Sequence, residues 1–416
     1  MSQRSVPTRN AAAPLIVHSH LRWDFVWQRP QQLLSRLAAT QPVLFVEEPV
    51  FVDETARGTL QVTEPYAGVT RVVPHLPSHL RDHYDDAIVV VRTLVREAVG
   101  EGGPLAGRFD RAVQWFYTPM PVPAMLGAFG ERGVVYDCMD ELAQFRFAPT
   151  ELGHRERMLL HAADVVFTGG HKLYQSKSRY HENVHFFGCG VDVQHFGKAR
   201  LEETALPEDI RDIARPIMGY FGVVDERLDY RLLRALAEAN PDCSLVMIGP
   251  VVKVDPAELP RAANIHWLGQ KSYADLPAYL KAFDVCLMPF ALNEATEYIN
   301  PTKTLEYMAA GKPIVSTAVA DVVRNFVPIV RVAESPMAFA DEVRSALSTS
   351  STERVREGIE RAAHSSWDAI VTQMRALIAN AVRGAEPEAI VSRPAARPHL
   401  VRATAPSDAT AASPAA

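Results

Sequence analysis

The residues with the clearest chemical potential lie in one segment, 300–313. Asn300 suits a helix N-cap and Pro301 suits the first helical position, so the segment predicts a helix that begins there. The free N–H groups of a helix N-terminus favour a phosphate, and Lys303 would add a positive charge. Glu306 shares a helix face with Lys303 and can accept hydrogen bonds from sugar hydroxyls. The segment therefore predicts a site for a phosphorylated sugar, with an ordinary capped surface helix as the alternative.

Two apolar runs must position this helix. The runs 283–290 and 314–317 have the composition of buried parallel strands, and Gly311 followed by Pro313 predicts that the helix ends between them. The helix would then begin at the carboxyl end of a strand, where open α/β sheets bind ligands.

Strand-like apolar runs alternate with helical patterns along the chain, and this pattern occurs twice. We therefore predict an α/β protein with two doubly wound parallel sheets. The stretch 197–215 is polar and acidic without periodicity, which indicates a linker with a boundary near residue 205. The predicted parts are a disordered N-terminal tail (1–13), a first domain (14–205), a second domain (206–365), a helix with one apolar face (366–383) and a disordered tail rich in Ala and Pro (384–416).

Composition narrows the class of protein. The net charge of −6 over 416 residues argues against a nucleic-acid partner. No apolar run approaches the length of a membrane span, and the first residues lack the apolar core of a signal peptide, which predicts a cytoplasmic protein. Four arginines recur among apolar residues of the 71–96 region, namely Arg71, Arg81, Arg92 and Arg96. This pattern is compatible with a peripheral contact with the membrane, and a solvated helix face is the alternative interpretation. The four cysteines have no metal-binding spacing, which predicts reduced thiols and no metal site.

Three further residues follow strand-like runs at positions that would face a ligand. Gly222 ends a Gly-Tyr-Phe-Gly turn, where the backbone could pass close to a pyrophosphate, and Arg227 could reach the phosphates from the same loop. A glycine turn required only by geometry is the alternative. Asp140 could meet an acceptor hydroxyl, or it could cap a helix.

At these motifs the chain resembles the retaining GT-B glycosyltransferases, the family 4-like group that includes enzymes of polysaccharide, lipopolysaccharide and teichuronic acid assembly. The resemblance extends over about 15–378 and is carried by the segments 18–20, 23–33, 135–141, 190–196, 219–222, 268–269 and 300–313. It implies two Rossmann-like domains that face each other across a cleft, the first binding the acceptor and the second the nucleotide-sugar donor. It also implies that the helix 366–383 crosses back to the first domain.

The same resemblance suggests roles for particular residues. Glu306 matches a glutamate that binds the donor ribose. Lys271 matches a position that contacts the donor base or diphosphate, and a solvated lysine is the alternative. Tyr298 replaces a second glutamate that faces the transferred sugar in most members, and Tyr117 stands where many members have a histidine. Two expected contacts to the donor sugar are therefore missing or replaced, with Tyr298 retained as a donor-binding candidate.

In the family, the loop after the first strand supports the donor phosphate and the acceptor. Here that loop carries His20, Arg22, Trp23, Gln28 and Arg29, whose polar groups could serve both ligands. Trp23 could stack on a sugar ring or could instead pin the loop to the domain.

The sequence thus predicts a glycosyltransferase that moves a sugar from a nucleoside diphosphate donor to a surface polysaccharide, exopolysaccharide or lipid-linked acceptor. Lys303, Arg227 and Asp140 are the catalytic candidates, with Asn300, Pro301, Thr302 and Gly222 beside the donor. The resemblance implies a retaining course without metal ion or cofactor, because cationic side chains would stabilise the leaving diphosphate. The second hypothesis is a catalytically weak GT-B subunit that binds a nucleotide or glycan and scaffolds an assembly complex. The third is a nucleotide-sugar epimerase.

Overall fold

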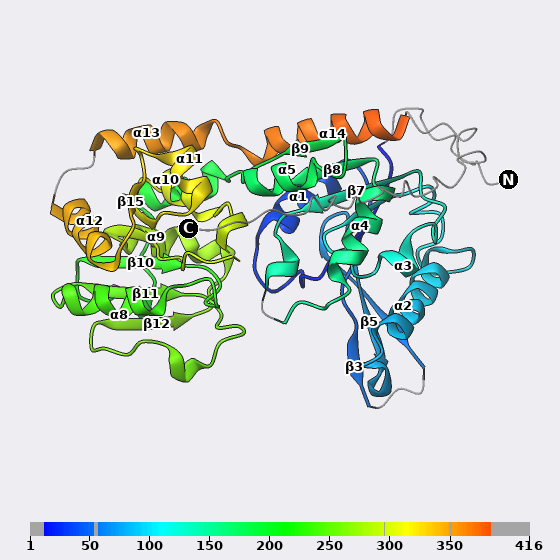
Figure 1. Ribbon diagram of the computed structural model, residues 1–416, viewed down its shortest axis with the longest axis horizontal. Helices are drawn as coiled ribbons and strands as arrows, with labels where there is room; N and C mark the ends of the chain where they lie inside the picture. The colour runs from blue at the N-terminus through cyan, green and yellow to red at the C-terminus, as the bar shows by residue number, and fades with distance from the viewer. Residues whose placement is uncertain (1–11, 54–56, 146, 295, 349–351, 384–416) are drawn as a thin grey trace, which may run out of the picture.

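The computed structural model describes residues 12–53, 57–145, 147–294, 296–348 and 352–383, which form two α/β units side by side (Figure 1). Each unit is built around one mostly parallel sheet with helices on its faces. The predicted fold class is therefore confirmed. Residues 1–11 and 384–416 lie outside the described residues, and almost all of the two predicted tails lie there with them.

The first unit holds a sheet with the strand order β3-β5-β2-β1-β6-β7-β8-β9, in which β4 pairs antiparallel with β5. Its strands are β1 Leu15–His18, β2 Val43–Val46, β3 Val50–Val52, β4 Thr59–Tyr66, β5 Val69–Pro77, β6 Val113–Phe116, β7 Gly133–Cys138, β8 Val165–Thr168 and β9 Val184–Phe186. Its helices are α1 Arg29–Ala38, α2 Tyr84–Val99, α3 Val122–Met125, α4 Leu152–Ala162 and α5 His171–Lys177.

Both faces of this sheet are buried, because successive side chains of a strand point in opposite directions. Ile16 of β1 packs in a cluster with residues of α2, α3 and α4. Its neighbours Leu15 and Val17 pack on the other face with residues of α1 and of the final helix, α14 Trp367–Arg383. The central strands therefore consist of continuous apolar runs, as expected for a doubly covered parallel sheet.

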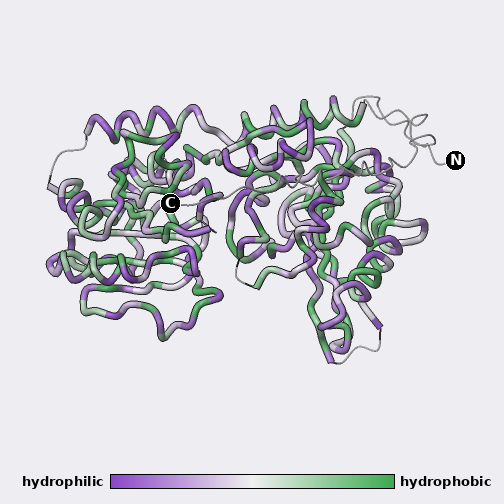
Figure 2. The backbone as a smooth tube through the Cα atoms, in the orientation of Figure 1, coloured by the Kyte–Doolittle hydropathy of each residue, from purple (hydrophilic) through white to green (hydrophobic). Residues whose placement is uncertain are grey.

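The final helix lies on the first unit although it follows the second unit in the chain (Figure 1). Figure 2 shows hydrophobic and hydrophilic residues alternating along this helix. Its apolar face includes the buried side chains of Val371, Met374 and Ile378, which pack against the first sheet. The helix α14 therefore joins the end of the second unit to the first.

The second unit holds a parallel sheet in the order β12-β11-β10-β13-β14-β15. Its strands are β10 Ile217–Phe221, β11 Ser244–Ile248, β12 Ile265–Gly269, β13 Val285–Met288, β14 Ile314–Thr317 and β15 Arg331–Ala333. The helices α6 Val193–Gly197 and α7 Glu208–Arg211 connect the units, and the remaining helices are α8 Tyr230–Ala239, α9 Leu276–Ala282, α10 Lys303–Ala309, α11 Ala320–Phe326, α12 Pro336–Ser348 and α13 Thr352–Ala363.

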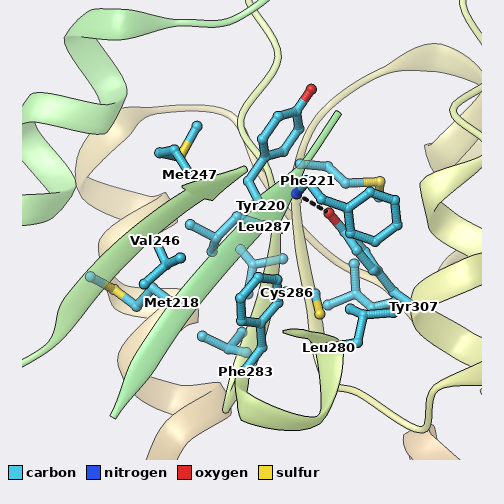
Figure 3. Close-up of a cluster of buried hydrophobic side chains, with 14 of the residues drawn as sticks. Met218, Tyr220, Phe221, Val246, Met247, Leu280, Phe283, Cys286, Leu287 and Tyr307 are labelled. Carbon is cyan, nitrogen blue, oxygen red and sulfur yellow. Dashed lines mark hydrogen bonds between the residues drawn. The ribbon is translucent and has the colours of Figure 1, made fainter. Parts of the chain in front are cut away.

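The core of the second unit fixes α10 against the end of β10 (Figure 3). Tyr307 of α10 is fully buried, and its hydroxyl accepts a hydrogen bond of 3.2 Å from the backbone N–H of Phe221. The Tyr307 and Phe221 rings also meet edge to face, with centroids 5.1 Å apart. These contacts hold the first turn of α10 beside the loop that follows β10.

Two local predictions from the sequence differ from the structure. The linker segment 197–215 is not wholly irregular, since it contains α7, whose Ile210 is buried. The arginines of the 71–96 region do not lie on one helix face, because Arg71 belongs to β5 and forms an ion pair with Asp24. The four cysteines are free thiols, as predicted.

Candidate functional site

A cavity of about 150 Å³ lies between the two units, beside the carboxyl ends of strands from both sheets. Both units contribute to its wall, which is the placement that open α/β sheets favour for ligands. The predicted site residues that line it are Gln28, Arg29, Asp140, Gly222, Arg227, Asn300, Pro301, Thr302, Lys303 and Glu306. The fold therefore gathers most of the predicted donor and catalytic residues at one place.

The helix α10 begins two residues later than predicted. Thr302 is its N-cap, without a side-chain capping bond, so the assignment of Asn300 as N-cap and Pro301 as first helical residue was wrong. Asn300 instead donates its side-chain amide to the carbonyl of Gly169 in the first unit, at 3.1 Å. That contact between units outweighs the local capping preference. The predicted end is confirmed, because α10 stops at Ala309, before the positive φ of Gly311.

Lys303 and Glu306 face the cavity from the first turn of α10. The Lys303 ammonium lies 5.5 Å from the ring centroid of Tyr220. Burial lowers the pKa of Lys303, and the neighbouring Glu306 partly opposes this effect. Burial raises the pKa of Glu306 to about 7, against the opposing charge of Lys303. A ligand that hydrogen-bonds the carboxylate and presents negative charge to the ammonium would compensate both groups for burial.

Gly222 is required by the close passage of Lys303. Its φ of +142° favours glycine, and a Cβ built there would lie 2.1 Å from the Lys303 Cε atom. The glycine therefore does more than turn the chain after β10, because it leaves the space through which the Lys303 side chain reaches the cavity.

Gly222→Ala is therefore expected to lower the free energy of unfolding by about 1–3 kcal/mol, through strained backbone and the displaced lysine. Urea denaturation measures the change. Gly102→Ala is the matched control, because Gly102 also has positive φ, +82°, but no atom lies within 4 Å of its built Cβ. Equal losses in the two variants would contradict the assigned contact.

The raised pKa of Glu306 predicts a pH dependence of stability. The pKa of Glu306 is about 7 in the folded protein, whereas its ordinary value is 4.5. As the pH rises from 4.5 to 7, the unfolded state loses this proton more readily than the folded state, so the free energy of unfolding decreases. Glu306→Gln removes this decrease and should gain stability relative to the native protein across that window, by up to about 3 kcal/mol. Urea denaturation at pH 5 and pH 8 tests this, and a constant difference at both values would contradict it.

Arg227, from the loop after β10 of the second unit, and Asp140, which follows β7 of the first unit, also line the cavity. The guanidinium of Arg227 donates to Oδ1 of the buried Asp225 at 3.0 Å and to its Oδ2 at 2.7 Å. This fixes the position of the guanidinium and balances part of its charge. Burial raises the pKa of Asp140, and Arg227 is the main charge that opposes this. Among the described residues, no hydrogen bond or ion pair engages the Asp140 carboxylate, so it stays available to a ligand.

An aromatic contact closes one side of the cavity and was missed by the sequence analysis. Tyr273 of the second unit lies 5.7 Å from Trp27 of the first unit, measured between ring centroids, and stacks on His195 at 4.3 Å. Its hydroxyl accepts a hydrogen bond from Gln32 of α1, at 2.9 Å. The available signal was its place shortly after the carboxyl end of β12, but an isolated tyrosine there does not identify a contact between units.

Two residues predicted to serve ligands are instead part of the fold. Arg29 is not on the loop but is the first residue of α1, and its guanidinium binds Asp137 at 2.9 Å and the Phe187 carbonyl at 2.9 Å. These contacts use most of the hydrogen-bond donors of Arg29, so its guanidinium has few donors left for a ligand. Trp23 is 4% exposed and meets Phe45 edge to face, which supports the alternative that it pins the loop.

The remaining predicted residues lie away from this cavity. His20 and Arg22 line a second cavity, whose wall comes mainly from the first unit and includes residues of the loops after β10 and β11. The Arg22 guanidinium pairs with Glu47 at 3.0 Å. Lys271 lines a third cavity of about 340 Å³ and pairs with Asp209 at 2.6 Å.

The two tyrosines that replace expected donor contacts do not line the cavity between the units. The ammonium of Lys172 lies 4.7 Å from the ring centroid of Tyr298, and the tyrosine packs against the buried core of the first unit. Tyr117 is buried in the first unit next to Trp115. Neither side chain therefore contributes to the wall of this cavity.

Within the described ranges, no group of three or more His, Cys, Asp or Glu side chains is placed to hold a metal ion. Within the same ranges, no helix has the length and apolar character needed to cross a membrane.

Comparisons with known proteins agree on the type of domain. Residues 215–349 match the family model described as "Glycosyl transferases group 1". A relative from Bacillus subtilis, described as "Putative teichuronic acid biosynthesis glycosyltransferase TuaH", is 23% identical over 231 residues, which cover 51% of this chain and 57% of the relative. The chain thus spans little more than half the length of that relative.

Solved structures share the architecture of nearly the whole chain. Sucrose-phosphate synthase from Thermosynechococcus elongatus superposes with a TM-score of 0.65 at 17% identity, over 90% of this chain and 100% of that one. A Burkholderia xenovorans trehalose-phosphate synthase in complex with glucose-6-phosphate gives 0.65 at 14% identity, over 88% and 100%. An E. coli structure bound with UDP-2-fluoro glucose gives 0.64 at 14% identity, over 89% and 99%. At these identities the likeness establishes the fold.

Proposed function

We propose that the protein is a glycosyltransferase with a GT-B fold, which transfers a sugar from a nucleoside diphosphate donor to a glycan or lipid-linked acceptor. The match of residues 215–349 to the family described as "Glycosyl transferases group 1" and the architecture shared with the solved structures support this proposal. The observation that carries the proposal is the convergence of Lys303, Glu306, Arg227 and Asp140 on one cavity between the units. The name of the B. subtilis relative supports an acceptor from surface polysaccharide assembly, and the protein would then act in the cytoplasm at the inner face of the membrane.

The donor would bind against the second unit. The diphosphate lies beside Gly222, where the Lys303 ammonium and the Arg227 guanidinium face the cavity. The Glu306 carboxylate accepts hydrogen bonds from the ribose hydroxyls, which favours its ionised form and offsets its burial. When the bond to the leaving diphosphate breaks, its oxygens gain negative charge, and the two preorganised cations stabilise that charge.

Asp140 would act on the acceptor side of the same cavity. Its carboxylate accepts a hydrogen bond from the attacking hydroxyl and stabilises the positive charge that develops at the anomeric carbon. A bond forms between the anomeric carbon and the acceptor oxygen as the bond to the diphosphate oxygen breaks, and the hydroxyl proton passes to the leaving diphosphate. Attack from the face of the leaving group gives a retaining course.

In this scheme Lys303 and Arg227 supply the positive charge, so transfer needs no metal ion and no cofactor. The test is to incubate the protein, with EDTA present, with UDP-, GDP-, dTDP- and ADP-sugars and with glycan or lipid-linked acceptors. We expect release of one nucleoside diphosphate and a product that keeps the anomeric configuration of the donor, read by NMR. Inversion, or release only after a divalent metal ion is added, would contradict the corresponding part of the proposal.

A second candidate function is supported by the displacement of Tyr298 and Tyr117 from the cavity, which leaves the donor sugar without two of its expected contacts. In that case the protein is a weakly catalytic subunit that binds a nucleotide or glycan and scaffolds an assembly complex. Donor binding without turnover, together with co-purification of a second transferase, would favour this function over transfer.

A further inference from the structure

A buried cluster of charged side chains lies next to Asp140 in the first unit, and the proposed mechanism does not use it. The Lys177 ammonium of α5 donates to the Glu141 carboxylate at 2.8 Å and to the Glu156 carboxylate of α4 at 2.9 Å. The side chains of Lys177, Glu141 and Glu156 are 4%, 11% and 12% exposed. The cluster therefore ties α4 and α5 to the segment that follows β7.

The cluster continues into the end of β7. The Tyr136 hydroxyl donates to the Glu156 carboxylate at 2.7 Å, and the Cys138 thiol donates to the backbone carbonyl of Asp140 at 3.5 Å. The backbone N–H of Gly169, directly after β8, donates to the carbonyl of Cys138 at 3.0 Å. The backbone on both sides of Asp140 is therefore held in place.

Asp140 depends on these neighbours for its position. Within the described part of the chain, its carboxylate has no hydrogen bond or ion pair, so its own side chain does not fix it. It nevertheless lines the cavity that contains Lys303 and Glu306, where the proposed mechanism needs it within hydrogen-bond distance of the acceptor hydroxyl. Misplacement of a reacting group by about 1 Å can lower a rate by about 100-fold.

The charges of the cluster are unbalanced, with one ammonium and two carboxylates. Burial raises the pKa of Glu141, and the Lys177 ammonium is the main charge that opposes this. Burial disfavours the charged form of Lys177, but the neighbouring thiol and carboxylates raise its pKa overall, so it stays an ammonium. A buried ionic cluster adds little net stability, because desolvation offsets most of the attraction, and in some proteins it selects one conformation instead. A positioning effect therefore accounts for this cluster better than stability does.

We propose that Glu141 is a positioning residue, whose ion pair with Lys177 holds the backbone that presents the Asp140 carboxylate to the cavity between the units. When Glu141 is replaced, Lys177 stays paired with Glu156, so one ammonium remains beside one carboxylate. The fold should therefore survive this change, whereas removal of Lys177 would leave two buried carboxylates unpaired. The inference rests on the proposed function, in which Asp140 is the catalytic carboxylate.

Kinetics of the Glu141 variants test the positioning effect. Glu141→Ala is expected to lower kcat by about tenfold or more while the donor dissociation constant stays within about twofold of the native value, because the donor contacts of α10 are unchanged. Glu141→Gln should keep kcat within about threefold of native, since its amide oxygen can still accept a hydrogen bond from Lys177. In the Asp140→Asn background, Glu141→Ala should change kcat by less than about twofold, because the group it positions is already inactive.

Labelling of Cys138 tests the same contact without turnover. The Cys138 thiol is 1% exposed and contacts the backbone carbonyl of Asp140. N-ethylmaleimide should modify Cys138 faster in Glu141→Ala than in the native protein, by about tenfold or more, because the segment after β7 opens locally. Glu141→Gln should be labelled at the native rate, as read by mass spectrometry of the peptides. Cys286, fully buried in the second unit, is the internal control and should be labelled equally slowly in all three proteins.

Asp85→Ala is the matched control, because Asp85 pairs with Arg155 of the same helix α4, at 2.6 Å, and lines neither cavity that contains Asp140. It should keep kcat within about twofold of native and leave the labelling of Cys138 unchanged. A native kcat or a native labelling rate in Glu141→Ala, or an equal loss of kcat in the Asp140→Asn background, would overturn the inference. A native protein without turnover, or a native kcat in Asp140→Asn, would refute the proposed function instead, and the labelling rates would still decide whether Glu141 holds the segment.

Discussion

Lys303→Ala is expected to lower kcat for sugar transfer by about 100-fold or more, the usual cost of removing one group that stabilises a leaving anion. The Lys303 ammonium reaches the cavity between the units through the space left by Gly222, where the proposed diphosphate lies. Burial lowers the pKa of this ammonium, so an anionic ligand beside it would favour its charged form. Steady-state kinetics with the identified donor measure the effect.

The control for this prediction is Lys198→Ala, which removes an exposed lysine of the connection between the units, away from the cavity. It should leave kcat within about twofold of the native value, since surface substitutions away from a site have small effects. Thermal unfolding of both variants checks that the fold is intact. A folded Lys303→Ala protein that turned over at the native rate would remove Lys303 from the mechanism.

Asp140→Asn is expected to lower kcat by about 100-fold while the donor dissociation constant stays near the native value, because it removes the negative charge that stabilises the positive charge developing at the anomeric carbon. Asp140 lines both the cavity between the units and the neighbouring cavity that contains His20 and Arg22, and its carboxylate has no hydrogen bond or ion pair among the described residues. The substitution keeps the size of the side chain but removes its charge. Kinetics and donor titration on the same sample separate the two effects.

The matched carboxylate control is Asp53→Asn, at an exposed position after β3. It should change neither kcat nor the donor dissociation constant. A variant of Asp140 that lost donor affinity and kept its kcat would show that the residue belongs to the donor side of the cleft.

The alternation of apolar runs and helical patterns was sufficient to predict the two parallel sheets, because central strands buried on both faces leave a strong signal. The antiparallel pair β4 and β5 was missed. Its strand β4 is largely exposed, so the run 59–66 mixes polar and apolar residues without a buried face. The strand β5 is largely buried, but Thr70, Arg71, Pro74 and His75 interrupt its apolar run. Local composition therefore predicts only the strands whose apolar runs are continuous.

The candidate site was predictable where residues follow parallel strands, since those ends meet at one edge of a sheet. Lys303, Glu306 and Gly222 came together for this reason. The incorrect predictions concern residues whose hydrogen-bond partners are distant in sequence. Arg29 is neutralised by Asp137, 108 residues away, and Asn300 is drawn from its capping role by Gly169.

The central claim is that the cavity between the units binds a nucleoside diphosphate through Glu306 and Lys303. A thermal-shift screen of the purified protein against UDP, GDP, dTDP, ADP and their sugars, repeated with Glu306→Ala, tests it most directly. A ligand that binds only the native state raises the melting temperature by mass action. The account predicts a rise with one nucleotide that disappears in the variant. No rise with any nucleotide, or an equal rise in both proteins, would contradict it.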